Sequence, residues 1–330
     1  MTAGPTPMTF AVLRVLADGE FHSGQALAVR FACSRASIHN ALREAEVLGL
    51  DLYRVRGRGY RLPQPPEWLD AAAIRAELAG DAPIFNLELL DCADSSNSLL
   101  MRRVGQGAPS GTVLGVEWQT AGRGRLGRRW HSGFGNGLTF SLLWRFDGGL
   151  SALSGLSLAV GVALIRAIRR LSVGGAYLKW PNDVLDGQGR KLAGILIEAQ
   201  GDMLGPSAVV IGIGMNVSLP DRLRGQLDQP ASSLAELAGV VPGRNRLLAA
   251  VLRELAAVLR EFARHGFAAL REEWEAAHLA QHQPVCLLAA DGTETCGTAR
   301  GVDASGALRL EAAHGELRVH AGEISLRMAA

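Results

Sequence analysis

The chain has 330 residues, of which 48% are hydrophobic and 20% are charged, and its formal net charge is +2. This composition is typical of a soluble globular protein with two or more domains. The net charge is too close to zero to indicate binding to nucleic acid by itself. The most apolar segment, residues 150–165, contains three serines and two glycines. It falls short of the roughly 20 apolar residues of a membrane-spanning helix, so we expect a cytoplasmic protein that does not contact the membrane.

Two residue inventories bear on the chemistry. The four cysteines are scattered without a Cys-x-x-Cys pair, so we expect neither a disulfide framework nor a zinc site, and a reducing compartment; they are Cys33, Cys92, Cys286 and Cys296. Only two of the 34 basic residues are lysines, Lys179 and Lys191, and both lie within thirteen residues. This clustering hints at a function that needs an ammonium group.

Residues 1–65 predict a winged helix-turn-helix domain that binds DNA. A short amphipathic helix over 9–17 is followed by helices that Ser23 and Ser34 can cap, over about 23–31 and 34–48. In the third helix, the apolar residues Ile38, Ala41, Leu42, Ala45 and Leu48 recur at helical spacing and leave a polar outer side. Two helices joined by a tight turn, the second of them polar, are typical of the helix-turn-helix motif.

The segment "DLYRVRGRGYRL", residues 51–62, predicts the basic hairpin that forms the wing. Residues 1–62 carry eight arginines against five acidic residues, and phosphate contacts need such a positive surface. An alternative is a winged helix that contacts protein. The candidate DNA contacts are Arg35, His39, Asn40, Arg43, Arg56 and Arg58. Prolines at 63, 65 and 66 mark a linker.

The remaining chain predicts an α+β fold in two parts. In residues 66–280 we expect strands near 84–90, 112–120, 137–146, 177–180, 191–199 and 207–217. We expect helices after Asp94 and over 152–171, 231–239 and 243–279. Residues 281–330 change to short strands separated by Asp-Gly, Ser-Gly and His-Gly turns, which favour a small β-barrel.

The stretch "GRGRLGRRW", residues 122–130, matches the G-x-G-x-x-G dinucleotide fingerprint. That fingerprint requires a helix to begin at its glycines, and the continuation "RRWHSGFGNG" lacks a helical apolar period. We therefore expect a loop over 121–136 whose arginines bind an anion and which is loose until that anion neutralises them. An Arg-Gly arm that binds nucleic acid is the alternative.

Three polar segments accompany the loop. They are "DSSNS" (94–98), "KWPND" (179–183) and "GIGMNV" (212–217). Each has a purely structural alternative: capping of a helix by Asp94 or Ser95, an ordinary turn, and a β-bulge that explains the glycines. Their joint presence with the Arg-Gly loop favours a functional site.

In this order, "QTAGRGRLGRRW", "KWPND", "KLAGILIE" and "GIGMNV" resemble the biotin protein ligase family, and the winged helix resembles its bifunctional, repressor-type members. The resemblance implies activation of biotin with ATP and Mg²⁺ to biotinyl-5′-AMP, then transfer to a lysine of a biotin carboxyl carrier domain. It implies a central mixed sheet with helices like that of class II aminoacyl-tRNA synthetases, and a C-terminal SH3-like barrel. It also implies a homodimer that binds operator DNA when biotinyl-AMP is bound.

The resemblance also assigns residues. Lys179 would act in catalysis with Arg123 and Arg125, while Arg125, Lys179 and Asn216 would bind the nucleotide. Lys191 is interpreted as a structural surface lysine. Leu223 and Leu227 replace a tryptophan that covers adenine in some members, which puts ligand-linked ordering in doubt. The residues that would bind biotin are Ser95, Ser96, Asn97, Gln119, Gly122, Arg123, Gly124, Arg125, Trp130 and Lys179.

Three alternatives remain. One is a biotin-sensing transcription factor that has lost catalysis, and another is a ligase whose winged helix does not regulate genes. The third is transfer of lipoate or octanoate, which shares the fold.

Overall fold

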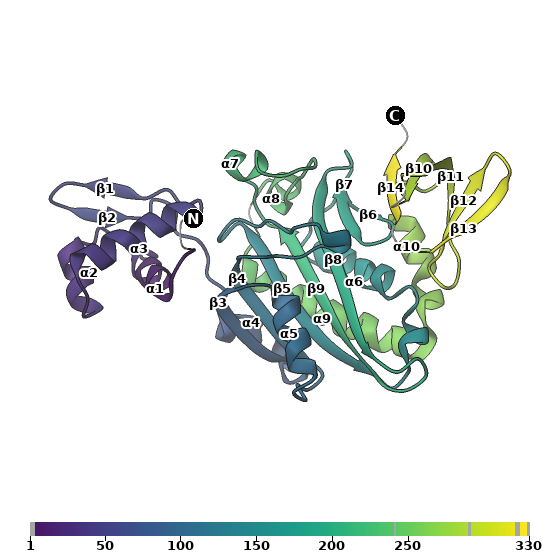
Figure 1. Cartoon of the computed structure of the whole chain (residues 1–330), viewed down its shortest axis with the longest axis horizontal. Helices are drawn as coiled ribbons and strands as arrows, with labels where there is room; N and C mark the ends of the chain where they lie inside the picture. Colours follow the sequence, from purple (N-terminus) through teal and green to yellow (C-terminus); the bar gives the residue numbers. More distant parts are fainter. Residues whose placement is uncertain (1–3, 241, 290–291, 321–323, 329–330) are drawn as a thin grey trace.

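The computed structural model describes residues 4–240, 242–289, 292–320 and 324–328. Three bodies follow one another along the chain (Figure 1): a small helical domain with a hairpin, a large sheet covered by helices, and a small sheet at the C-terminus. Every helix in the described part of the chain is too short or too polar to span a bilayer.

The N-terminal domain confirms the predicted winged helix. Helices α1 (Pro7–Leu16), α2 (Gly24–Arg30) and α3 (Arg35–Val47) precede the hairpin of β1 (Tyr53–Val55) and β2 (Gly59–Arg61). The Ser23 hydroxyl accepts the backbone N–H of Ala26, and the Ser34 hydroxyl accepts that of Ser37, so both predicted caps are formed. The predicted apolar side of α3 is buried.

The central domain is built on a seven-stranded mixed sheet in the order β3-β4-β5-β9-β8-β7-β6. Only β3 and β4 are parallel. We did not predict β7, which follows β6 after a turn of three residues. The bounds are β3 (Asn86–Ala93), β4 (Thr112–Gln119), β5 (Gly137–Phe146), β6 (Ala176–Lys179), β7 (Asp183–Asp186), β8 (Lys191–Gly201) and β9 (Ser207–Asn216).

Helices cover both faces of this sheet (Figure 1). Helix α5 (Ser96–Val104) packs on one face, and α6 (Leu156–Arg170) and α9 (Arg244–His265) pack on the other beside α4 (Ala71–Leu78). The single helix expected over 243–279 is wrong: Gly266, with φ of +65°, ends α9 before α10 (Arg271–Ala277). Shorter helical segments are Ala79–Ile84, Arg125–Gly127, Leu150–Leu153, α7 (Asp221–Arg224), α8 (Leu234–Ala238) and Phe267–Leu270.

The C-terminal domain is a five-stranded antiparallel sheet in the order β13-β12-β11-β10-β14. Its inner face continues the large core, because Val285, Leu308 and Leu326 are buried in the same cluster as α6 and α9. The strands are β10 (Pro284–Ala289), β11 (Glu294–Val302), β12 (Leu308–Ala312), β13 (Gly315–Val319) and β14 (Ile324–Met328).

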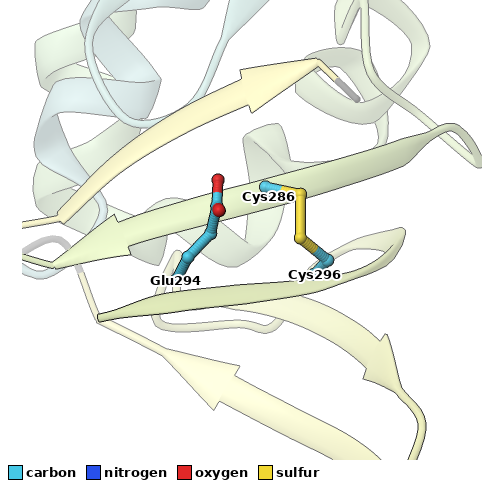
Figure 2. A group of neighbouring side chains, drawn as sticks. All are labelled: Cys286, Glu294 and Cys296. Carbon is cyan, nitrogen blue, oxygen red and sulfur yellow. A yellow bond between two sulfur atoms is a disulfide. The ribbon is translucent and has the colours of Figure 1, made fainter. Parts of the chain in front are cut away.

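The expectation of no disulfide is wrong for one cysteine pair. Cys286 on β10 lies directly opposite Cys296 on β11, and a disulfide joins them, with Glu294 beside them (Figure 2). Spacing motifs such as Cys-x-x-Cys do not report this pair, because the register of the antiparallel strands brings the two residues together. Cys33 and Cys92 are free.

The winged helix shares its core with the Arg-Gly loop. Phe134, near the end of that loop, is 1% exposed and belongs to the N-terminal hydrophobic cluster. Its ring centroid lies 5.9 Å from that of Phe10 and 5.0 Å from that of Trp68, the latter edge-on. The two domains are therefore in apolar contact through the segment that follows the predicted site.

A buried ion pair joins both ends of the loop to α9. Arg244, at the start of α9, lies 2.7 Å from Glu117 on β4, and both side chains are nearly inaccessible. The Arg244 guanidinium also donates to the carbonyl of Gly137, the first residue of β5, and to that of Glu67. One cation thus fixes the strand before the loop, the strand after it and the interdomain linker.

We predict that Glu117→Gln lowers the free energy of unfolding by about 3–5 kcal/mol, because it leaves the Arg244 charge buried without a counter-charge. Urea denaturation of the full chain measures this loss. The matched control is Asp81→Asn, which removes the counter-charge of Arg253 in an ion pair that is far more exposed than that of Arg244 with Glu117. It should lower the free energy of unfolding by about 1 kcal/mol or less. Equal losses in the two variants would contradict the prediction.

Candidate functional site

A cavity of about 530 Å³ lies beneath the Arg-Gly loop at one end of the central sheet. The start of β8 pairs with the end of β9, and the end of β4 and the start of α5 meet them there. Most of the predicted site residues converge on this cavity. The ones that line it are Ser95, Ser96, Asn97, Gln119, Arg123, Gly124, Arg125, Trp130, Lys179 and Asn216.

One end of the cavity is a neutral hydrogen-bonding network at the start of α5. Gln119 Oε1 accepts the backbone N–H of Ser96 at 2.7 Å, and Ser141 Oγ lies 2.7 Å from Ser96 Oγ. Ser141 donates to Asn97 Oδ1 at 2.5 Å. Ser95 caps α5, as the structural alternative predicted, and also lines the cavity. These contacts orient hydroxyl and amide groups toward one space.

Backbone hydrogen bonds join the two ends of the segment from Gly122 to Trp130 in the Arg-Gly loop. The backbone N–H of Trp130 donates to the Gly122 carbonyl at 3.0 Å, and the backbone N–H of Gly124 donates to the Arg128 carbonyl at 2.8 Å. Residues 125–127 form only a short turn, in which Leu126 has a φ of +55°. The prediction that no helix begins at these glycines, and hence that they are not a dinucleotide fingerprint, is therefore confirmed.

Two arginines of the loop have protein partners, and one of these partners, Glu198, is an anion of the chain itself. Arg123 pairs with Glu198 at 2.9 Å, and Arg125 donates to Asn182 Oδ1 at 3.2 Å. Gly122 does not line the main cavity. Its carbonyl holds the base of the loop, and it borders a smaller adjoining cavity of about 160 Å³ together with Leu223.

The glycines of "GIGMNV" are explained by close packing, and the bulge alternative is wrong. Strand β9 keeps an unbroken register with β5 across residues 207–216 and with β8 across residues 207–215. A Cβ atom on Gly212 would lie 2.1 Å from Asn97 Oδ1, and one on Gly214 would lie 2.2 Å from the Trp130 ring. Glycine at these positions lets Asn97 and Trp130 lie against the strand.

The other end of the cavity is cationic, and both lysines of the chain line it. The interpretation of Lys191 as a surface lysine is wrong. Its side chain is 17% exposed, its ammonium lies 2.7 Å from Asp183, and it lies 5.9 Å from the Trp130 ring centroid. Burial lowers the pKa of Lys179. The charge of Asp183 acts in the opposite direction and raises this pKa, whereas the charge of Lys191 lowers it further. Two ammonium groups and one carboxylate therefore share a partly desolvated space.

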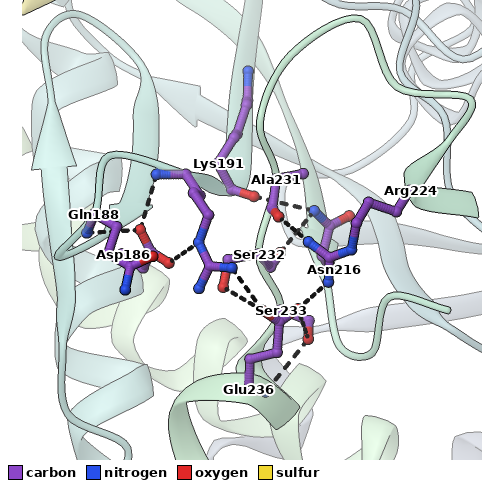
Figure 3. Close-up of polar contacts among 10 residues, drawn as sticks. Asp186, Gln188, Lys191, Asn216, Arg224, Ala231, Ser232, Ser233 and Glu236 are labelled. Atoms are coloured by element: carbon purple, nitrogen blue, oxygen red, sulfur yellow. Dashed lines mark hydrogen bonds and ion pairs between the residues drawn. The ribbon is translucent and has the colours of Figure 1, made fainter. Parts of the chain in front are cut away.

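Asn216 anchors the neighbouring segment. Its buried amide donates to the carbonyls of Lys191 and Ser232, so it ties the segment before α8 to β8 (Figure 3). Glu236 adds a charged anchor, because it pairs with Arg224 of α7 at 2.7 Å and with Arg190 at 3.0 Å. The segment between β9 and α8 is thus held by protein contacts, and its Leu227 lines the cavity.

Sequence reasoning missed several lining residues. Asn182 and Asp183 belong to the "KWPND" segment, so that segment contained the signal. Leu326 and Arg327 come from β14, and no pattern in the sequence connected them with the central domain. The missed polar and terminal residues include Thr139, Asn182, Asp183, Lys191, Asp228, Leu326 and Arg327.

The predicted DNA contacts share one property, which is exposure. On α3 they lie opposite the buried Ile38, Ala41 and Leu42. In the wing, the Arg58 guanidinium stacks on the Phe21 ring at 4.2 Å. The exposed candidates are Arg35, His39, Asn40, Arg43, Arg56 and Arg58.

Comparisons with known proteins agree with this arrangement. Residues 9–61 match an HTH domain, residues 89–216 match the biotin/lipoate A/B protein ligase family, and residues 283–327 match the biotin protein ligase C-terminal domain. The chain is 38% identical over 326 residues to the bifunctional ligase/repressor BirA of Salmonella typhimurium, covering 98% of this chain and 99% of that protein.

Two further relatives extend the comparison. The bifunctional ligase/repressor BirA of Escherichia coli is 39% identical over 318 residues, covering 96% of this chain and 97% of that protein. The solved biotin protein ligase from Aquifex aeolicus in complex with biotin and ATP has 30% identity and a TM-score of 0.62. The matched region covers 74% of this chain and 99% of the Aquifex aeolicus chain.

We predict that Gly214→Ala displaces the Trp130 ring and lowers the free energy of unfolding by about 1–3 kcal/mol, as overpacking of a filled site does. Urea denaturation followed by tryptophan fluorescence measures both effects. Gly174→Ala is the matched control, because a Cβ there meets no atom within 4 Å. An unchanged emission spectrum and midpoint for Gly214→Ala would refute this packing.

Proposed function

The chain belongs to the family of bifunctional biotin protein ligases and repressors, and we propose that the cavity beneath the Arg-Gly loop is where it joins biotin to AMP. In this reaction the biotin carboxylate attacks the α-phosphorus of ATP and pyrophosphate leaves. The amine of a carrier lysine then attacks the acyl carbon of biotinyl-AMP, an amide forms and AMP leaves. The observation that carries the assignment is the division of one cavity into a neutral amide-and-hydroxyl end and a cationic end.

The neutral end suits the ureido ring of biotin. That ring offers one carbonyl and two N–H groups, and it needs small groups that both donate and accept. Gln119 keeps its Nε2 amide for a ligand because its Oε1 is already used by Ser96. Ser95, Ser96 and Asn97 add further polar atoms at the same wall.

The cationic end suits the two anions that must meet. A carboxylate is already a nucleophile, so this step needs no general base, and the protein contributes positioning and charge neutralisation. We assign this role to Lys179 together with Arg125, and we add Lys191. Arg123, which the resemblance also assigned to catalysis, pairs with Glu198 at the neutral end, so we propose that it acts on biotin there. Asp183 limits the repulsion between the two ammonium groups by pairing with Lys191.

The nucleotide would extend from the lysines toward Asn216 and Leu227. Asn216 holds the backbone there, and Leu227 offers an apolar surface for adenine. Arg327 reaches the cavity from β14, so we propose that the C-terminal domain, which we interpret as an SH3-like barrel, completes the site.

Mg²⁺ fits this site as an ion carried by the nucleotide. The lining carboxylates are Asp183, which is paired with Lys191, and Asp228. One or two carboxylates plus substrate phosphates are the usual ligands of Mg²⁺. When bound, the ion would neutralise charge on the phosphates.

The winged helix gives the chain its second role, as a repressor that binds DNA. We propose that α3 enters the major groove through Arg35, His39, Asn40 and Arg43, with Arg56 and Arg58 on phosphate. We also propose that biotinyl-AMP favours a homodimer, which matches a two-fold operator. The basic loop and the two partly buried lysines argue against a sensor that has lost catalysis.

We predict that Lys179→Ala and Lys191→Ala each reduce biotin-dependent exchange between ATP and pyrophosphate by about 100-fold or more, as loss of one electrostatic contact in a closed site does. Isotope exchange with purified full-length protein measures this. Arg264→Ala, an exposed cation on α9 outside the cavity, should keep the wild-type rate. Wild-type exchange by Lys191→Ala would show that this residue only pairs with Asp183.

We predict that the pair Arg35→Ala and Arg56→Ala weakens binding to DNA from upstream of biotin synthesis or transport genes, while exchange activity stays unchanged. Loss of the Arg56 phosphate contact should reduce the slope of log affinity against log salt by about one, and loss of Arg35 from the major groove should weaken binding further. Fluorescence anisotropy at several salt concentrations, with biotin and ATP present, gives this slope. If the double variant bound with wild-type affinity and slope, α3 and the wing would not be the DNA surface.

A further inference from the structure

We propose that Glu198 is a positioning residue for biotin. It holds Asn97, and Arg123 at the start of the Arg-Gly loop, in the geometry that binds the ligand. The proposal rests on the proposed function of the cavity. Glu198 lies on β8, and it is not among the residues that line the cavity. Any effect on biotin must therefore pass through the side chains that Glu198 holds.

The Glu198 carboxylate accepts from two residues of the site at once. Arg123 Nη2 lies 2.9 Å from Oε1, and Arg123 Nη1 donates to Oε2 at 3.2 Å. The Asn97 amide donates to the same Oε2 at 3.0 Å. The Glu198 side chain is 24% exposed and that of Arg123 is 47% exposed, so it is the carboxylate side of the pair that is partly shielded from water. One acidic side chain thus connects the start of α5 with the loop.

The first consequence concerns Asn97. Its Nδ2 donates to Glu198 and to the Leu196 carbonyl, and its Oδ1 accepts from Ser141. These contacts distinguish the two ends of the amide, because Glu198 accepts only and cannot face Oδ1. Asn97 therefore presents a fixed orientation to the ureido ring, and that orientation depends on a charged acceptor.

The second consequence concerns the loop. Arg123 is flanked by Arg125, Arg128 and Arg129, and like charges in one short loop repel one another. Glu198 neutralises Arg123, which also donates to the Ser98 hydroxyl at 3.1 Å. Arg123, at the start of the loop, is thereby held against β8 by Glu198 and against α5 by Ser98. Glu198 thus keeps the loop closed over the uncharged part of biotin.

The test compares Glu198→Gln and Glu198→Asp with the wild-type full-length chain. In exchange assays, Glu198→Gln should raise the KM for biotin at least about tenfold, while kcat and the KM for ATP stay within about twofold. Tenfold corresponds to about 1.4 kcal/mol of binding free energy. Trypsin should cleave the ligand-free variant faster within residues 123–129. Glu198→Asp retains the charge and should recover part of the affinity for biotin.

Glu88→Gln is the matched control. Glu88 on β3 pairs with Arg103 of α5 and lies outside the cavity, so the control removes the same charge from an ion pair of the same domain. It should leave both KM values and the loop cleavage unchanged.

Two outcomes would overturn the proposal. One is an unchanged KM for biotin in Glu198→Gln. The other is a parallel fall in kcat, both affinities and the urea midpoint, which would indicate a general structural role. Failure of the proposed function is distinguishable, because the wild-type chain itself would then show no biotin-dependent exchange.

Discussion

The buried pair of Arg244 with Glu117 is the constraint on which the site depends. Glu117 lies two residues before Gln119, and the Gly137 carbonyl that Arg244 also binds is the first of the strand after the loop. A buried guanidinium must keep its counter-charge, so these segments cannot separate without a large free-energy cost. The sixteen-residue loop over 121–136 therefore starts and ends at fixed points, and closing it over the cavity requires ordering only its middle.

Charge is distributed unevenly along the cavity, in the way that the proposed reaction requires. Amide and hydroxyl groups that bond to one another form the neutral end, where Glu198 offsets the Arg123 charge. The cationic end holds both lysines of a chain that otherwise uses arginine. An ammonium is a compact charge on a flexible stem, whereas a guanidinium is a broad planar fork. Two anions that approach within bonding distance are matched better by compact charges between them.

The sequence predicted most elements of the fold, and most of the ligand-binding residues that it predicted do line the cavity, because periodicity, capping and motifs such as "KWPND" are local signals. Apart from β7 and the break at Gly266, its errors concern contacts between distant segments. The Cys286–Cys296 pair depends on the register of two strands, and the glycines of β9 depend on Asn97 and Trp130 packing against them. Lys191 was misassigned because its burial beside Asp183 follows from the pairing of β7 with β8. Arg327 arrives from another domain.

Phe134 shows that the chain is less modular than its three domains suggest. This ring belongs by sequence to the ligase domain, yet it completes the hydrophobic core of the winged helix with Phe10 and Trp68. Removing the first 65 residues would leave an aromatic surface exposed next to the loop that covers the cavity. A gene that lost the regulatory domain in evolution would therefore need compensating substitutions in the catalytic domain.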